Sequence, residues 1–248
     1  MSGNTILITG GASGIGLGLA QAFHALGNTV LIAGRRQDAL DAAVAAHPGL
    51  HAYTLDVTDP ASIAALTARV TAEHPALNVL INNAGIMQAE DIQAAPDTSV
   101  AEATVVTNLL GPIRVTHALL PTLLAQPHAA VMNVSSGLAS VPLAATPTYS
   151  ATKAAVHSYT ESLRWQLRDT AVQVLELTPP AVGTDLMPGS RANPHAMPLD
   201  AYVTEVMDIL TTQPDAREIC VQAVRFLRDA EATGTYDRVF DTVNAARR

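Results

Sequence analysis

The sequence predicts an α/β fold in which helices cover both faces of a doubly wound parallel sheet, within a single domain. Strand-like runs alternate with helical segments along most of the chain, as repeated β-α units require. The early strand runs are uniformly apolar, which is typical of strands buried on both faces. The chain's 248 residues, 48% hydrophobic and 15% charged, are enough for one substantial core.

The elements follow in regular order. Asp59 is a candidate helix cap, and Pro60 suits the first helical position because its missing N–H costs nothing there. The strands are predicted at residues 5–8, 29–33, 51–55, 79–81, 129–134 and 172–177. The helices are predicted at residues 15–26, 37–46, from 60 onwards, 105–120 and 149–169.

The chain changes character after the sixth strand. Repeated prolines exclude a long helix directly after it, and a long loop in a compact domain is often a functional lid. We therefore expect a substrate lid at about 180–215, including a helix from Leu199 to Leu210, within the single catalytic domain 1–248. Residues 218–227 and 236–244 are expected to be helical, although 236–243 could also form a strand.

Composition narrows the possible partners. The formal charge of −8 and the pI near 5.4 argue against nucleic acid, which needs a clustered basic surface. Cys220 is the only cysteine, so no intrachain disulfide is possible. The N-terminal residues lack a basic signal-peptide region, and no apolar run reaches membrane-spanning length. We expect a cytoplasmic protein with no membrane or nucleic-acid partner.

A glycine-rich turn joins the first strand to the first helix. The residues from Thr9 to Gly16 read T-G-G-A-S-G-I-G. Glycines in such a turn permit positive φ angles and a close backbone approach, and a helix N-terminus favours a pyrophosphate. The turn therefore predicts a dinucleotide site whose cofactor-binding residues are Gly10, Ser13, Gly14, Ile15 and Gly16.

This turn and several later motifs together resemble the short-chain dehydrogenase/reductase family, in its compact single-domain branch. The later motifs are Asp56-Val57, the run Asn82-Asn83-Ala84-Gly85, Asn108, Ser136 and the stretch from Tyr149 to Lys153. The resemblance runs from about residue 5 to residue 184 and implies a Rossmann fold.

The same resemblance assigns part of the cofactor site. It implies that Asp56 and Val57 border the adenine, while Asn83, Ala84 and Gly85 line the adenosine side of the cleft. Asn82 is explained equally well as a tie between neighbouring strands.

The end of the second strand indicates which dinucleotide binds. An acid there would hydrogen-bond the ribose 2′-hydroxyl, whereas arginine accommodates a 2′-phosphate. This chain has Gly34-Arg35-Arg36, with no carboxylate at the tip. Arg35 and Arg36 therefore favour NADP(H).

Tyr149 and Lys153 form the expected catalytic pair. They are four residues apart, so one helix face presents both, and a nearby cation favours the phenolate. Lys153 is also the only lysine, although the chain has 13 arginines, which points to chemistry that guanidinium cannot perform.

The resemblance supplies the remaining roles. It makes Tyr149 the general acid in carbonyl reduction and the base in the reverse direction. It places Lys153 on the nicotinamide ribose, Ser136 on the substrate oxygen, and Asn108 on a proton-relaying water. Val182 and Thr184 would touch the carboxamide, next to Pro179-Pro180 where the family usually has Pro-Gly.

The sequence thus predicts an NADPH-dependent oxidoreductase that reversibly reduces a small hydrophobic ketone or aldehyde. Two alternatives remain: an NADP-binding sensor without turnover, and an NAD-linked alcohol dehydrogenase. An apolar substrate wall is expected from Leu138, Val141, Leu143, Ala181, Leu186 and Met187, although several of these could be core residues. The eight histidines show no metal-ligand spacing, so no metal is expected.

We expect a homodimer. Leu119, Leu123, Leu163 and Leu167 are candidate apolar positions for its interface, and Trp165 could anchor the rim. No final strand ending in Asp-Gly-Gly, as many members of the family carry, is found in the sequence, which argues against a tetramer.

Overall fold

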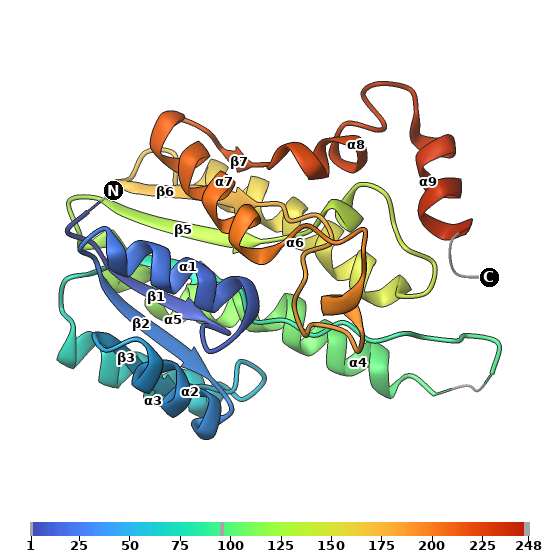
Figure 1. Cartoon of the computed structure of the whole chain (residues 1–248). Helices are drawn as coiled ribbons and strands as arrows, with labels where there is room; N and C mark the ends of the chain where they lie inside the picture. Colours follow the sequence, from blue (N-terminus) through green and yellow to red (C-terminus); the bar gives the residue numbers. More distant parts are fainter. Residues whose placement is uncertain (1, 95–96, 246–248) are drawn as a thin grey trace.

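A computed structural model describes residues 2–94 and 97–245, and within them seven parallel strands form one sheet in the order β3-β2-β1-β4-β5-β6-β7 (Figure 1). The apolar residues of β1 and β2 are all buried, as predicted. The strands are β1 (Thr5–Thr9), β2 (Thr29–Gly34), β3 (Leu50–Thr54), β4 (Leu77–Asn82), β5 (Ala129–Val134), β6 (Val172–Leu177) and β7 (Glu218–Ile219). The order reverses beside β1, and in doubly wound sheets ligands bind at the carboxyl edge of such a reversal.

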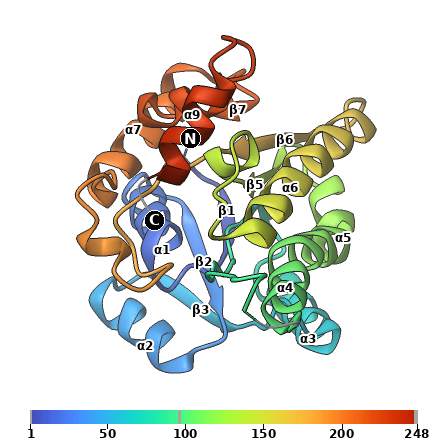
Figure 2. The same cartoon turned by 90° about the vertical axis from the view of Figure 1, so that its right-hand side faces the viewer.

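Helices cover both faces of this sheet (Figure 2). Two apolar clusters form the core: one packs α1, α2 and α7 on one face, and the other packs α3, α5 and α6 on the opposite face. The helices are α1 (Gly14–Ala25), α2 (Gln37–Ala46), α3 (Pro60–Glu73), α4 (Ser99–Val105), α5 (Gly111–Leu124), α6 (Pro147–Gln166), α7 (Leu199–Thr212), α8 (Arg225–Arg228) and α9 (Tyr236–Ala245).

The expected single helix over residues 105–120 is two helices joined by a π-helical turn. The turn spans Val106–Leu110, between α4 and α5, and contains Asn108. An extra residue per turn changes the direction of the side chains that follow, and such turns concentrate at functional sites. Hydrophobic period alone could not reveal this break.

The C-terminal segment differs from the prediction. The helix expected at residues 218–227 is wrong in its first part, because Glu218–Ile219 pairs in parallel with β6 as strand β7. A short final strand is therefore present where none was expected, although it does not end in Asp-Gly-Gly. Two residues are too few to show a period, and the free edge of β6 determines their conformation. Residues 236–245 form helix α9, so the helical alternative is confirmed there.

The segment expected as a lid has two parts. Helix α7 packs into the core, where Tyr202, Val206 and Leu210 are buried. A β-carbon on Gly18 of α1 would lie 2.8 Å from Val203, so the two helices are in close contact. Only the loop before α7, about residues 185–196, is largely exposed.

The four leucines expected at a dimer interface face the interior. Leu119, Leu123, Leu163 and Leu167 are at most 7% exposed and belong to the core cluster under α5 and α6. The expectation that they form an outward apolar surface is wrong, because they occupy the sheet-facing stripe of each helix. Trp165 is 69% exposed, as a rim position requires.

No helix among the described residues is long and apolar enough to span a bilayer.

Candidate active site

The glycine-rich turn needs glycine at several positions, either for its backbone conformation or because neighbouring atoms leave no space for a side chain. Gly10 and Gly14 have φ angles of 65° and 53°, in the left-handed region that favours glycine. A β-carbon on Gly16 would lie 2.4 Å from the carbonyl oxygen of Gly10. Ser13 is the N-cap of α1, yet its side chain makes no capping hydrogen bond. The first turn of α1, with Ile15 in it, can therefore direct N–H groups toward a phosphate.

Asn83 fixes this turn to the end of β4. Its Nδ2 donates to the carbonyl oxygens of Thr9 and Gly10 at 3.0 and 3.1 Å. The Thr9 hydroxyl accepts from the backbone N–H groups of Asn83 and Ala84. Asn83 thus shapes the turn from beneath, while Asn82 donates to Asn133 and Thr116 and ties β4 to its neighbours.

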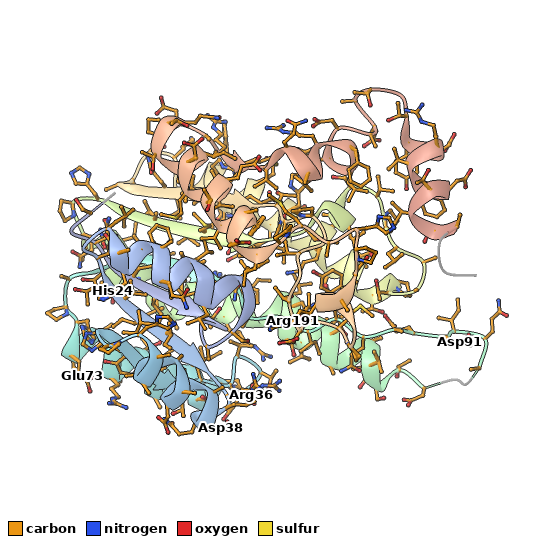
Figure 3. All side chains as sticks on the ribbon, in the orientation of Figure 1. His24, Arg36, Asp38, Glu73, Asp91 and Arg191 are labelled. Atoms are coloured by element: carbon orange, nitrogen blue, oxygen red, sulfur yellow. The ribbon has the colours of Figure 1, made fainter. Side chains whose placement is uncertain are left out.

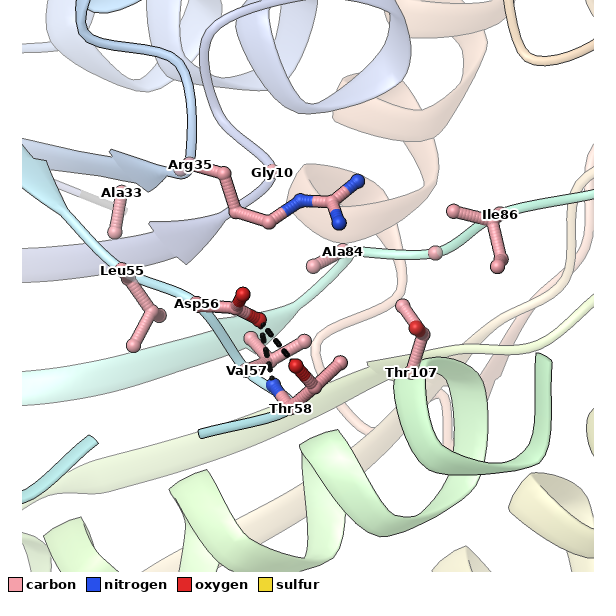
Figure 4. Close-up of a pocket in the computed structure, with 12 residues that line it drawn as sticks. Gly10, Ala33, Arg35, Leu55, Asp56, Val57, Thr58, Ala84, Ile86 and Thr107 are labelled. Atoms are coloured by element: carbon pink, nitrogen blue, oxygen red, sulfur yellow. Dashed lines mark hydrogen bonds between the residues drawn. The ribbon is translucent and has the colours of Figure 1, made fainter. Parts of the chain in front are cut away.

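A pocket of about 120 Å³ lies at the carboxyl edge beside this turn (Figure 4). Ends of β1, β2 and β4 surround it, as expected at a topological switch point. Its lining contains the predicted Gly10, Arg35, Asp56, Val57, Ala84 and Gly85. It also contains Ala33, Gly34, Leu55, Thr58, Ile86 and Thr107, which were not among the predicted site residues. The strand-end positions Ala33 and Leu55 could have been found from the carboxyl-edge rule.

The two arginines after β2 are not equivalent. Arg35 lines the pocket and its guanidinium extends over the cavity between Gly10 and Ala84 (Figure 4). Arg36 is not among the lining residues, and its side chain lies at the outer edge near Asp38 (Figure 3). Of the predicted pair, the structure therefore brings only Arg35 to the pocket.

Asp56 is held in place as an anion. Burial raises the pKa of its carboxyl, but hydrogen bonds from Thr58 and the charge of Arg35 outweigh burial and bring it below the usual value. The Thr58 N–H and hydroxyl donate to Asp56 Oδ1 at 2.9 and 2.7 Å. The pocket thus contains one cation and one anion beside the apolar walls of Leu55 and Val57.

Helix α6 carries Tyr149 and Lys153 on its buried face. Lys153 Nζ lies 5.5 Å from the centre of the Tyr149 ring and donates to the carbonyl oxygen of Val134 at 2.7 Å. Tyr149, Lys153 and Ser136 are each at most 7% exposed. Ser136 follows the end of β5, so strand and helix together bring the three side chains to the carboxyl edge.

Burial dominates the protonation of this pair. It raises the pKa of Tyr149 to about 12, with a hydrogen bond from Ser136 acting in the opposite direction. It lowers the pKa of Lys153 to about 8, opposed by the charge of Glu176. The depressed tyrosine pKa expected from the sequence is therefore not a property of the chain alone.

Asn108 connects the π-helical turn with the loop after β4. Its side chain accepts from the N–H of Ile86 and donates to the carbonyl oxygen of the same residue, both at 2.8 Å. Its Nδ2 also lies 3.4 Å from the Thr152 hydroxyl on α6. The Asn108 amide is therefore engaged in holding the pocket wall beside α6.

The segment after β6 reaches the glycine-rich turn. Val182 and Thr184 are buried, and a β-carbon on Gly14 would lie 3.4 Å from the Thr184 side chain. Gly137 donates its N–H to the carbonyl oxygen of Pro179 at 2.9 Å, which joins the Pro-Pro segment to the Ser136 loop. The segment after β6 therefore lies close both to the glycine-rich turn and to the Ser136 loop.

A second pocket of about 380 Å³ lies beside α6 and is almost entirely apolar. Of the predicted substrate wall, it contains Leu138 and Leu143, with Phe240 of α9 closing one side. Val141 is instead buried in the small cluster beneath α8 and α9, and Leu186 and Ala181 are exposed. The residues predicted to form one apolar substrate wall therefore lie in three different places: in this pocket, in the core and on the surface.

Comparison with known proteins agrees with this geometry. The model of the family described as short chain dehydrogenase matches residues 4–195. The uncharacterized oxidoreductase DltE of Bacillus subtilis is 40% identical over 249 residues, covering 98% of both chains. The NADP-dependent 3-hydroxy acid dehydrogenase YdfG of Escherichia coli K12 is 34% identical, covering 72% of each. A Burkholderia cenocepacia short-chain dehydrogenase solved with NADP superposes with a TM-score of 0.82 at 25% identity, over 96% of this chain and 98% of that one.

Proposed function

The chain belongs to the short-chain dehydrogenase family and is an oxidoreductase, and from that premise we propose that it reduces the carbonyl of a small hydrophobic ketone or aldehyde with NADPH. The observation that carries the proposal is the buried group formed by Ser136, Tyr149 and Lys153, which lies at the carboxyl edge of the sheet where β5 ends. A phenol, a cation and a hydroxyl at that place are suited to polarising and protonating a carbonyl oxygen.

The residues of the crevice fit a dinucleotide. Bound NADPH would supply the hydride. Gly10, Ser13, Gly14, Ile15 and Gly16 would hold its pyrophosphate, and Arg35 its 2′-phosphate. Asp56, Val57, Asn83, Ala84 and Gly85 would surround the adenosine. Val182, Thr184 and Lys153 would hold the nicotinamide end.

The chain's own chemistry centres on Tyr149. Its hydroxyl would donate a proton to the substrate oxygen, while Ser136 donates a hydrogen bond to the same oxygen. Lys153 would stabilise the tyrosinate left after the transfer, because its ammonium lies beside the ring. Asn108 would hold a water that returns the proton, and its fixed side chain suits a positioning task. The reverse reaction uses the same groups with Tyr149 as base.

Cofactor choice rests on Arg35. Its guanidinium stands over the pocket, and Gly34 offers no carboxylate to repel a 2′-phosphate. We expect a higher kcat/KM with NADPH than with NADH, and a loss of that preference in Arg35→Ser. Arg36→Ser is the matched control and should keep it, because Arg36 lies outside the pocket lining. Equal kcat/KM for the two cofactors in the parent protein would contradict the NADP assignment and favour NAD-linked alcohol oxidation.

Substrate class is tested with a panel of carbonyl compounds. Leu138, whose N–H donates to Ser136 Oγ, brings an apolar side chain close to Ser136, so hydrophobic ketones should react faster than charged ones. The panel should include 3-oxo acids, because YdfG is named for 3-hydroxy acids. Binding of NADPH without turnover of any compound would favour a sensor or interaction protein.

The exposed loop of about residues 185–196 would act as the substrate lid. Its Asp185–Arg191 ion pair is solvent-exposed and holds the loop locally. We further propose a cytoplasmic homodimer, with no nucleic-acid or membrane partner.

A further inference from the structure

A row of polar residues crosses four strands of the sheet near its carboxyl edge. Asn82 of β4 lies opposite Asn133 of β5, Asn133 opposite Glu176 of β6, and Glu176 opposite Glu218 of β7. Residues opposite each other on parallel strands point to the same face. Asn133 donates to Thr160 of α6 at 3.0 Å, so this face is the one that α6 covers.

Glu176 is the buried acid of this row. It is 2% exposed, and an isolated carboxylate there would be costly. His157 compensates it, with Nδ1 at 2.8 Å from Glu176 Oε2. Because an ionised carboxylate only accepts hydrogen bonds, the imidazole Nδ1–H is the donor. His157 itself is 34% exposed, so the pair extends from the interior to the surface.

The same helix face carries Lys153 one turn before His157. The Lys153 ammonium is 5% exposed and donates to the Val134 carbonyl oxygen, which is a neutral acceptor. Val134 lies directly after Asn133, so the ammonium sits one residue along the sheet from the polar row. Glu176 acts on this ammonium through its charge, against the effect of burial.

Other charges nearby are already matched. Glu218 accepts two hydrogen bonds from the Arg228 guanidinium, at 2.7 and 2.8 Å. Arg164 donates to the backbone oxygens of Val174 and Arg217 and pairs with Glu161. The titratable and charged groups around Glu176 are Lys153, His157 and Arg164 of α6, Glu218 of β7 with the adjoining Cys220, and Arg228 of α8.

We propose that Glu176, which is hydrogen-bonded to His157, is a positioning residue whose charge keeps Lys153 protonated at neutral pH and thereby keeps an ammonium group beside Tyr149. Its catalytic consequence rests on the function proposed above, whereas the charge coupling itself does not. Glu176 is never in contact with substrate in this arrangement; it acts through Lys153.

The single lysine makes the coupling directly measurable. Protein labelled with ¹³Cε,¹⁵Nζ-lysine has one lysine side-chain signal, from Lys153. Its titration in the parent chain should have a midpoint near pH 8. In Glu176→Gln, which keeps the shape of the side chain and still accepts from His157, the midpoint should fall by about one pH unit or more. Glu161→Gln, an exposed change on the same helix, should leave it in place.

Two further variants keep the test decisive if Glu176→Gln does not fold. Glu218→Gln leaves the Arg228 charge unmatched near Glu176, so the lysine midpoint should fall by a smaller amount. Glu176→Asp keeps the charge and should retain a midpoint closer to the parent value. The inference would be overturned if the lysine midpoint were unchanged in Glu176→Gln and Glu218→Gln. It would also be overturned if the midpoint fell as far in Glu161→Gln as in Glu176→Gln.

A turnover measurement then separates the two proposals. The alkaline limb of the kcat profile should move to lower pH in Glu176→Gln, which a purely structural defect would not cause. If the Lys153 midpoint falls in Glu176→Gln but the parent protein has no reductase activity, the proposed function is refuted and the coupling is supported. Reductase activity together with an unchanged Lys153 midpoint in Glu176→Gln would support the proposed function and refute the coupling.

Discussion

Lys153 is the proposed catalytic residue that the sequence singles out most sharply. Its position was predictable, because it is the only lysine and stands four residues after Tyr149. Its electrostatic surroundings were not, because Glu176 reaches it through strand register rather than through sequence spacing. The sequence also could not predict that Arg35 lines the pocket while Arg36 does not, because the directions of two neighbouring side chains at a strand end depend on the conformation of the loop that follows.

Lys153 should make stability depend on pH in a defined window. Its pKa falls from 10.5 in a free side chain to about 8 in the folded chain. Between these values the unfolded chain binds a proton that the folded chain has released, so the free energy of unfolding rises with pH. From pH 8 to 10 the rise should be about 2 kcal/mol relative to Lys153→Met.

Urea unfolding of both proteins at several pH values measures this difference. Referring the parent to Lys153→Met removes contributions common to both proteins. Tyr149, whose pKa is raised from 10.0 to about 12, acts in the opposite direction from about pH 9 upward, and it is present in both proteins. A difference between the two proteins that stays constant from pH 8 to 10 would contradict a depressed lysine pKa.

At the scale of elements, the loop after β4 determines how helix α6 begins. Glu90 accepts from the N–H and hydroxyl of Thr148 at 3.0 and 2.7 Å, and its own N–H donates to the carbonyl oxygen of Ala145. Thr146, the N-cap residue, makes no side-chain capping bond. The cap therefore comes from a distant loop, one residue before Tyr149.

Glu90→Ala should destabilise the protein by about 1 kcal/mol, the usual cost of losing a helix cap. It should also reduce kcat, because the backbone that positions Tyr149 loses its anchor. Chemical denaturation and steady-state kinetics check the two effects. Glu231→Ala removes an exposed acid from the loop between α8 and α9 and is the control. A stability loss no larger than that of the control would contradict the capping role.

The helices and strands were predicted correctly where the hydrophobic pattern extends over many residues, and they were missed where the element is only a few residues long. The buried strands and long helices followed from uniform apolar runs and helical spacing. Strand β7 has two residues, and the π-helical turn inserts one irregular turn into an otherwise helical pattern. Neither feature leaves a periodic signal, and each depends on a neighbour that folds against it.

At the scale of the whole molecule, α5 and α6 lie side by side on one face (Figure 2). Trp165 and Leu124, near the ends of these helices, are 69% and 45% exposed. A twofold contact would use such a surface twice. Light scattering should therefore report about twice the chain mass of 25.8 kDa.

Trp165→Glu should shift this equilibrium toward the monomer, since it places a charge in the contact. Phe226→Glu changes an exposed aromatic residue on the short helix α8 and should leave the mass unchanged. A parent protein that remains monomeric at micromolar concentration would remove the proposed interface. A stable tetramer would show that the β7 region also takes part in assembly.

The most direct test of the central claim compares NADPH oxidation by the parent and by Tyr149→Phe with the same ketone. The phenol oxygen is the proposed proton donor, and a positioned proton donor is worth roughly 10²–10⁴-fold in rate. We predict that turnover falls by that factor, while NADPH binding, followed by protein fluorescence, is largely unchanged. A folded Tyr149→Phe protein that reduces the ketone at the parent rate would contradict the assignment of Tyr149 as the acid.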